Sequence, residues 1–226
     1  MKAGFTYIIF LIDRSGSMSS LRDDTIGGFN AFVEEQKKAP GKAVLTLAQF
    51  DDKFQIDYEG LDIHKVPELT PETFVPRGGT ALRDAAARLM ISAGSKLSVM
   101  KEEDRPDNVI FVVITDGVEN ASKETPAYIL KEMIDLQTNM YNWKFLFLGA
   151  NMDAALVGNN MGMSGLSYKA TGGGMRRSID TASSYVGNTR TGNLRAAKAI
   201  LGSKDVDDVD VETSIHLFRK SIKNKN

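Results

Sequence analysis

The chain has 226 residues, 42% of them hydrophobic, which is enough for one domain with a substantial core. Its 28 basic and 29 acidic side chains nearly cancel, so the overall charge favours neither nucleic acid nor a strongly acidic partner. The absence of cysteine excludes disulfides, a catalytic thiol, and zinc or iron–sulfur sites that depend on thiolates.

The first predicted element is a strand over residues 5–12, whose unbroken apolar run over residues 8–12 ends at Asp13. A run without alternation is typical of a strand buried on both faces, as in a parallel sheet covered by helices. The run is too short to span a membrane, and no small-residue cleavage site follows it. No later apolar stretch reaches spanning length either, so we expect a soluble cytoplasmic protein that binds neither membrane nor nucleic acid.

The next elements combine helices with a hairpin. A helix is predicted over residues 21–38, where apolar residues recur at helical spacing, and Pro40-Gly41 ends it. Two strand-like runs follow at residues 43–50 and 53–58, joined by the turn-forming pair Asp51-Asp52, which predicts an antiparallel edge strand. After an irregular segment, a helix is expected over residues 81–93, with Thr80 at its N-terminus.

Strands and helices then alternate. Residues 108–115 repeat the opening pattern and end at a second carboxylate, Asp116. The remaining predicted elements are a helix capped by Thr125, a strand over 143–148, a helix over 153–161, a weak strand over 166–169, and helices over 174–187 and 194–201. Such alternation is typical of parallel βαβ units. The sequence therefore predicts an α/β, doubly wound (Rossmann-like), mostly parallel six-stranded sheet with one antiparallel edge strand and helices on both faces.

The pattern weakens towards the C-terminus. We expect one domain over residues 1–202, followed by a charged tail of partial order over residues 203–226. Within the domain, residues 172–174 are three glycines followed by Arg176 and Arg177. This segment lacks the spacing of a phosphate-binding loop, so we interpret it as a flexible turn rather than a phosphate cradle.

Two carboxylates and three hydroxyls stand out as possible ligands of one metal ion. They are Asp13, Ser15, Ser17, Thr80 and Asp116. The carboxyl ends of strands in an open α/β sheet are where ligands bind, and both aspartates follow buried strands. Hard oxygen ligands without nitrogen or sulfur suit Mg²⁺ or Mn²⁺.

Each of these residues also has an ordinary structural explanation. The aspartates are common in turns after strands, and Ser15, Ser17 and Thr80 are suited to capping helices. Thr80 is a weaker capping-box candidate, because position 83 is Arg where such a box has Glu or Gln. Capping and metal binding are also compatible in one loop. The conjunction of two strand-end aspartates with three loop hydroxyls favours the metal site.

These residues resemble the metal-ion-dependent adhesion site (MIDAS) of the von Willebrand factor type A (vWA) domain. The family's Asp-x-Ser-x-Ser motif matches Asp13, Ser15 and Ser17, its isolated Thr matches Thr80, and its later Asp matches Asp116. The resemblance covers residues 5–165 and implies the strand order 3-2-1-4-5-6, with the ligand site between strands 1 and 4. It also implies that the three hydroxyls bind the metal directly and the aspartates directly or through water. A sixth position is left for a partner's carboxylate or for solvent.

The function implied by the resemblance is metal-dependent protein binding without catalysis. Intracellular members of the family, of bacterial or phage type, often work with AAA-type ATPases or with products of stress-resistance and phage operons. One alternative is a Mg²⁺-dependent phosphatase or hydrolase, although haloacid-dehalogenase-like phosphatases need a second acid where this chain has Ser15. The other alternative is a scaffold in which the metal only stabilises the loops. His64 and His216 lack a flanking motif, so a Ser/His/Asp triad has little support.

Overall fold

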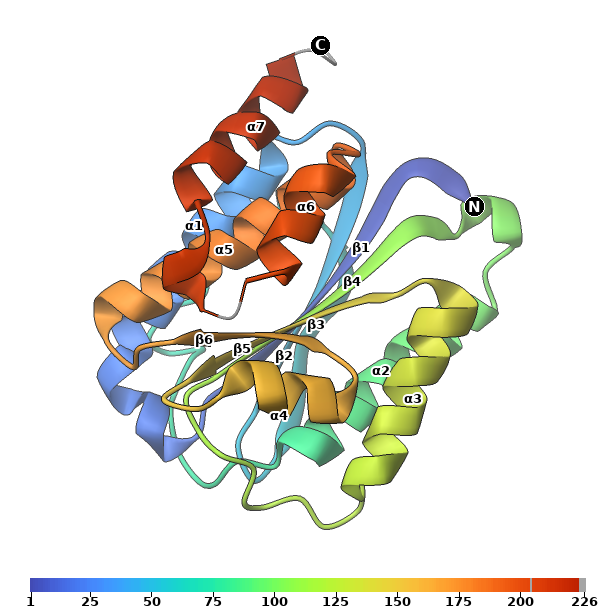
Figure 1. Cartoon of the computed structure of the whole chain (residues 1–226). Coiled ribbons are helices and arrows are strands. Elements are labelled where there is room, and N and C mark those ends of the chain that lie inside the picture. Colours follow the sequence, from blue (N-terminus) through green and yellow to red (C-terminus); the bar gives the residue numbers. More distant parts are fainter. Residues whose placement is uncertain (204, 224–226) are drawn as a thin grey trace.

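Six strands form one twisted sheet in the computed structural model, which describes residues 1–203 and 205–223. They are β1 (Lys2–Asp13), β2 (Lys42–Phe50), β3 (Phe54–Asp62), β4 (Pro106–Thr115), β5 (Lys144–Ala150) and β6 (Ser164–Tyr168). Their order is β3-β2-β1-β4-β5-β6 (Figure 1), and every neighbouring pair is parallel except β2 with β3. The predicted fold class, strand order and antiparallel edge strand are confirmed.

Helices cover both faces of the sheet (Figure 1). One face carries α1 (Arg22–Lys37), α5 (Gly172–Arg190) and α6 (Leu194–Leu201), and the other carries α2 (Leu82–Ser98), α3 (Ala127–Tyr141) and α4 (Ala154–Met161). The short 3-10 segments are η1 (Gly16–Leu21), η2 (Ile63–Lys65), η3 (Glu102–Asp104) and η4 (Val206–Asp208). None of the helices in residues 1–203 and 205–223 is long and apolar enough to cross a membrane.

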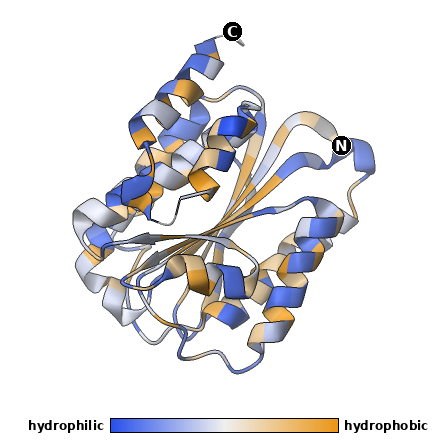
Figure 2. Ribbon diagram, in the orientation of Figure 1, coloured by the Kyte–Doolittle hydropathy of each residue, from blue (hydrophilic) through white to orange (hydrophobic). Residues whose placement is uncertain are grey.

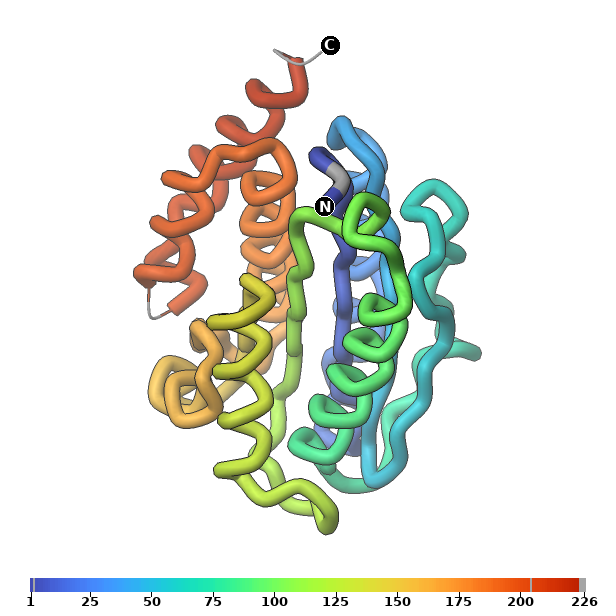
Figure 3. The backbone as a smooth tube through the Cα atoms, turned by 90° about the vertical axis from the view of Figure 1, so that its right-hand side faces the viewer, coloured from blue at the N-terminus to red at the C-terminus, as the bar shows by residue number. Residues whose placement is uncertain are grey.

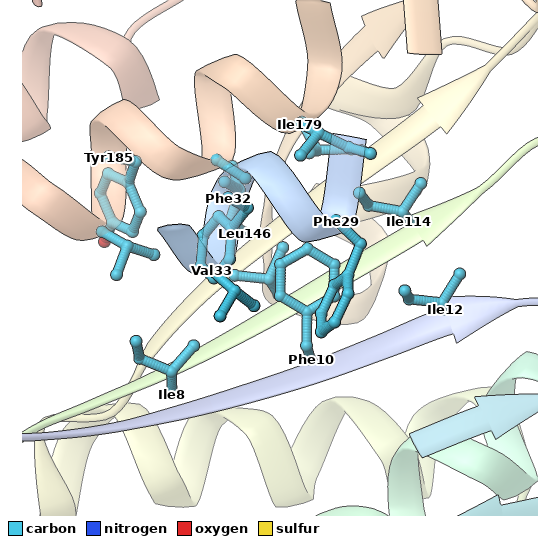
Figure 4. Packing of buried hydrophobic residues seen from close by; sticks show 14 of the residues in the cluster. Ile8, Phe10, Ile12, Phe29, Phe32, Val33, Ile114, Leu146, Ile179 and Tyr185 are labelled. Atoms are coloured by element: carbon cyan, nitrogen blue, oxygen red, sulfur yellow. The ribbon is translucent and has the colours of Figure 1, made fainter. Parts of the chain in front are cut away.

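The central strand β1 explains why the opening run shows no alternation. Its side chains point by turns to two separate cores, with Ile8, Phe10 and Ile12 in one and Tyr7, Ile9 and Leu11 in the other. In the first core the ring of Phe10 packs edge-on against Phe29 and Phe32 of α1, with centroid distances of 5.5 and 5.0 Å (Figure 4). Hydrophobic residues follow the central strands throughout (Figure 2). This packing fixes the end of β1, where Asp13 lies.

The segment expected to be a charged tail contains a helix, α7 (Val211–Lys223), which runs beside α5 (Figure 3). Its Phe218 is fully buried, and a Cβ built on Gly187 of α5 would lie 2.7 Å from the Phe218 ring. The Asn188 amide also donates to the Ser214 carbonyl at 3.0 Å. Burial on one helical face stabilises this segment despite its charge. Residues 204 and 224–226 of the expected tail lie outside the described residues, and the domain boundary at 202 stays a prediction.

Replacing Gly187 with alanine is expected to destabilise the protein by about 1–3 kcal/mol, because the new methyl group overlaps the Phe218 ring. Chemical denaturation monitored by circular dichroism measures the change. Gly27→Ala in α1 is the matched control, because nothing lies within 4 Å of a Cβ there. Alanine is favoured over glycine in a helix, so Gly27→Ala should gain slightly in stability. An equal gain in Gly187→Ala would show that α7 does not dock on α5 in solution.

Three local predictions are wrong. Thr80 does not begin α2, whose N-cap is Ala81, and Thr125 does not cap α3, whose N-cap is Pro126. The Thr125 N–H instead donates to Asp84, which holds the preceding loop against α2. Residues 172–174 are the first turn of α5 rather than a flexible turn, because the Thr171 hydroxyl accepts from the Gly174 N–H at 3.1 Å.

Candidate metal centre

Asp13 ends β1 and is completely buried. One of its carboxylate oxygens accepts from the Ser15 N–H at 2.6 Å, and the other accepts from the Thr115 hydroxyl at 2.5 Å. Thr115 is the last residue of β4, the strand that pairs with β1. The neighbouring strand ends therefore hold the Asp13 carboxylate in one orientation.

Ser17 links the first loop to the end of β4. Its hydroxyl donates to Asp116 at 2.6 Å and lies 3.1 Å from the Ser15 hydroxyl. Exposure increases along this group: Asp13 and Ser15 are buried, Asp116 is partly buried and Ser17 is exposed. The centre therefore opens to solvent on the side of Ser17 and Asp116.

Thr80 comes from a third loop and is 2% exposed. Its backbone N–H donates to the Asn120 side chain at 2.9 Å, and its carbonyl accepts from the N–H groups of Asn120 and Ala121. The Gly16 N–H also donates to the Gly78 carbonyl at 3.1 Å, which ties the first loop to the Thr80 loop. Backbone bonds therefore position the Thr80 side chain from two directions.

Gly117 marks the place where oxygens from these loops converge. A Cβ built on Gly117 would lie 2.9 Å from the Thr80 hydroxyl oxygen, 3.6 Å from that of Ser17 and 3.7 Å from an Asp13 carboxylate oxygen. Ser15 and Asp116 join the same group through their contacts with Ser17. The structure thus brings all the predicted site residues together around a space that a side chain at position 117 would enter.

The donor set has the chemistry of a hard-cation site. Within residues 1–203 and 205–223, no group of three or more His, Cys, Asp or Glu side chains is placed to hold a metal. An ion here would rest on two carboxylates and three hydroxyls, all oxygen, which suits Mg²⁺ or Mn²⁺. The residues therefore fit the metal that the sequence predicts.

Burial makes negative charge costly at this centre. It raises the pKa of Asp13 to about 6, against hydrogen bonds from Thr115 and Ser15 that lower it, and Asp116 raises it further. Burial also raises the pKa of Asp116. A cation close to both carboxylates would stabilise their ionised forms and offset the cost of burying two negative charges.

The hydroxyls of Ser15 and Thr80 do not cap helices in the structure. Ser15 precedes η1 without a side-chain capping bond, and the N-cap of α1 is Leu21. Thr80 lies outside α2, as described above. The hydroxyls of Ser15 and Thr80 are therefore not engaged as helix caps.

An ion-pair cluster around the buried Asp51 was not found from the sequence. Asp51 is completely buried, and one of its oxygens accepts from Arg14 at 3.0 Å and from Arg77 at 2.9 Å. Burial alone would raise the pKa of Asp51, but the hydrogen bonds from Arg77 and Lys53 and the charge of Arg14 hold it below its ordinary value. The turn-forming pair Asp51-Asp52 gave no sign of this role. The cluster clamps the first loop to the segment that leads to Thr80.

Asp51→Asn is expected to weaken Mg²⁺ binding by about 10–100-fold, as loss of groups that orient metal ligands typically does. The amide cannot compensate both guanidinium groups, so the loops carrying Ser15 and Thr80 lose their common anchor. Isothermal titration calorimetry measures the change, and Asp23→Asn is a control because Asp23 is an exposed residue of α1. Unchanged affinity in a folded Asp51→Asn protein would contradict the clamping role.

No family model and no curated protein matches this sequence. Solved structures do match. The von Willebrand factor domain of the type V pili tip protein Mfa5 from Porphyromonas gingivalis superposes with a TM-score of 0.53 at 10% identity. The match covers 80% of this chain and 94% of that one.

The chain has the vWA fold. Proximal thread matrix protein 1 from the mussel byssus shares it, with a TM-score of 0.53 at 13% identity. The structure of the same mussel protein with a zinc-occupied MIDAS motif gives 0.50 at 17% identity. Each match covers 80% of this chain and 46% of the mussel chain, so this chain spans about half the length of the mussel protein.

Proposed function

We propose that this vWA chain is a non-catalytic, metal-dependent protein-interaction module. A divalent cation, Mg²⁺ or Mn²⁺, binds to Asp13, Ser15, Ser17, Thr80 and Asp116 in a MIDAS arrangement. The cation supplies a positive centre for an Asp or Glu carboxylate of a protein partner. Two carboxylates neutralise a dication no more than fully, so a further anionic oxygen remains a favourable ligand.

The observation that carries the proposal is the convergence of oxygens at Gly117. Oxygens of Asp13, Ser17 and Thr80 lie within 3.7 Å of the position of a Cβ built on Gly117, and the Ser17 hydroxyl also donates to Asp116. The raised pKa values of Asp13 and Asp116 support a cation in that space. The zinc-occupied MIDAS motif of the mussel protein supports a divalent metal in the same fold.

The composition of the centre supports binding rather than catalysis. Its predicted residues are two carboxylates and three hydroxyls, with no histidine, lysine or cysteine among them to act as a general base or an activated nucleophile. A phosphatase of the haloacid dehalogenase type would also need an acid where Ser15 stands. We therefore propose no enzymatic activity for the centre.

The partner is proposed to be a cytoplasmic protein. The absence of cysteine agrees with that compartment. By analogy with intracellular vWA proteins, AAA-type ATPases and products of stress-resistance or phage operons are the first partners to examine. The chemistry of the site requires only that the partner present an exposed carboxylate.

A pull-down from lysate of the native host tests the proposal. The wild-type chain and Asp13→Ala are compared in Mg²⁺ and in chelator, with Asp23→Ala as a matched control at an exposed carboxylate. We expect specific partners only with wild type and Asp23→Ala, and only with Mg²⁺. The same proteins in every lane would refute metal-dependent binding, and Mg²⁺-dependent phosphatase activity lost in Asp13→Asn would refute the non-catalytic role.

A further inference from the structure

A cavity of about 490 Å³ lies along the edge strand β3. Its walls are residues of β3, from Gln55 to Tyr58, and the segment over residues 67–77. In Figure 3 this segment follows β3 along the outer edge of the molecule. Arg14, which lies between the predicted ligands Asp13 and Ser15, lines the cavity as well. The cavity and the candidate metal centre therefore share the loop that begins at the end of β1.

Among the described residues, the positive side chains of the cavity are paired with an opposite charge, whereas its negative side chains are not. Arg14 and Arg77 both bond to Asp51, so the arginines are already occupied by a buried carboxylate. The other charged lining residues are the carboxylates Asp57, Glu68 and Glu72. No salt bridge to these three is formed within the described part of the chain. The cavity as a whole therefore has an excess of negative charge.

Two buried polar atoms, one on β3 and one on the paired strand β2, have no hydrogen-bond partner among the described residues. They are the Tyr58 hydroxyl and the Gln49 side-chain oxygen. The Gln49 amide nitrogen donates to the lining residues Asp57, at 2.6 Å, and Thr73, at 2.9 Å. These two acceptors fix the orientation of the amide, so its oxygen is available only as an acceptor. Unmet acceptors of this kind are satisfied by a donor-rich ligand.

Asp57 itself is the carboxylate best placed to hold a cation. It is half-buried, and the side chains of Gln49 and Gln55 donate to its oxygens without neutralising it. Burial raises the pKa of Asp57 despite those hydrogen bonds and the charge of Arg14. A cationic donor would neutralise Asp57 and offer hydrogen bonds to the neighbouring hydroxyl of Tyr58.

We propose that this cavity binds a lysine or arginine side chain of the partner whose carboxylate reaches the metal centre. The assignment to a partner rests on the proposed function, whereas the affinity of the cavity for a basic side chain does not. The partner would then present an acidic and a basic residue on one surface. The acidic residue determines metal dependence, and the basic residue adds specificity.

The test titrates N-acetyl-lysine methylamide into the full, ¹⁵N-labelled chain and records amide chemical shifts. N-acetyl-norleucine methylamide is the neutral control probe, since it keeps the aliphatic part and lacks the charge. We expect the lysine probe to shift resonances of β3 and residues 67–77, with at least tenfold tighter binding than norleucine. The shifts should occur in Mg²⁺ and in chelator alike.

Two variants identify the carboxylates. Asp57→Asn and Glu68→Gln are each expected to weaken lysine binding, the first at least tenfold, whereas Glu132→Gln on α3 should leave it unchanged. Thermal melting confirms that each variant is folded. Equal binding of the lysine and norleucine probes, or unaltered binding by folded Asp57→Asn, would overturn the proposal. Lysine binding without any metal-dependent partner would leave the cavity assignment standing and refute the proposed function alone.

Discussion

Gly117→Ala is expected to lower the affinity for Mg²⁺ by on the order of 100-fold or more, because the methyl group enters the space where the oxygens converge. That group would lie 2.9 Å from the Thr80 hydroxyl oxygen, closer than van der Waals contact allows. The substitution removes no ligand and no charge, so it separates obstruction of the site from loss of its chemistry. Isothermal titration calorimetry with Mg²⁺ and with Mn²⁺ measures the loss.

Gly173→Ala is the matched control for this experiment, since a Cβ at Gly173 meets nothing within 4 Å. The control should bind Mg²⁺ as the parent does. Circular dichroism establishes whether Gly117→Ala keeps its fold. Full Mg²⁺ affinity in a folded Gly117→Ala protein would place the ion elsewhere and remove the observation on which the proposed function rests.

The metal-free protein is expected to lose stability as the pH rises from about 4 to about 7. The folded pKa of Asp13, about 6, lies above its ordinary value of 3.8, so the folded state retains a proton that the unfolded chain releases. The protonated Asp13 side chain contributes its full stabilisation at pH values below 3.8. That contribution is lost as the pH rises through the pKa of Asp13 in the folded protein. The difference corresponds to roughly 3 kcal/mol of unfolding free energy. Urea denaturation in chelator at several pH values measures it.

Asp13→Asn provides the comparison for the pH experiment. Its amide keeps the size of the side chain and has no proton to lose, so its stability should vary less between pH 4 and 7. Mg²⁺ at pH 7 should restore stability to the parent and not to the variant, by binding linkage. Parallel pH profiles of parent and Asp13→Asn in chelator would contradict the raised pKa of Asp13.

Much of the fold could be predicted because its strands are buried on both faces. The apolar runs before Asp13 and Asp116 are long, unbroken and separated by helical periodicity, which leaves few alternative arrangements. The C-terminal helix α7 was harder to predict. Its contact with the core depends on Phe218 packing against a glycine of α5, and the local sequence around either residue does not predict that contact. Burial against a distant element outweighs local polarity there.

The candidate centre was predictable where its residues follow strands. Asp13 and Asp116 end neighbouring strands, so sheet topology alone brings them together. The role of Asp51 was not predictable, because an aspartate in a turn has the same local sequence whether it is exposed or binds two arginines. The N-cap of α2 was missed because Thr80 is held by Asn120, forty residues later in the chain.

The bonds that hold the loops together join protein groups to one another, and this bears on what a metal would do for the protein. Gly16 bonds to Gly78, Arg14 and Arg77 share Asp51, and Thr115 bonds to Asp13. A preorganised centre spends little conformational entropy when an ion arrives, unlike a zinc finger, which folds only with its metal. If the proposed function is correct, cation exchange need not involve unfolding, and partner attachment would follow the ambient concentration of the ion reversibly.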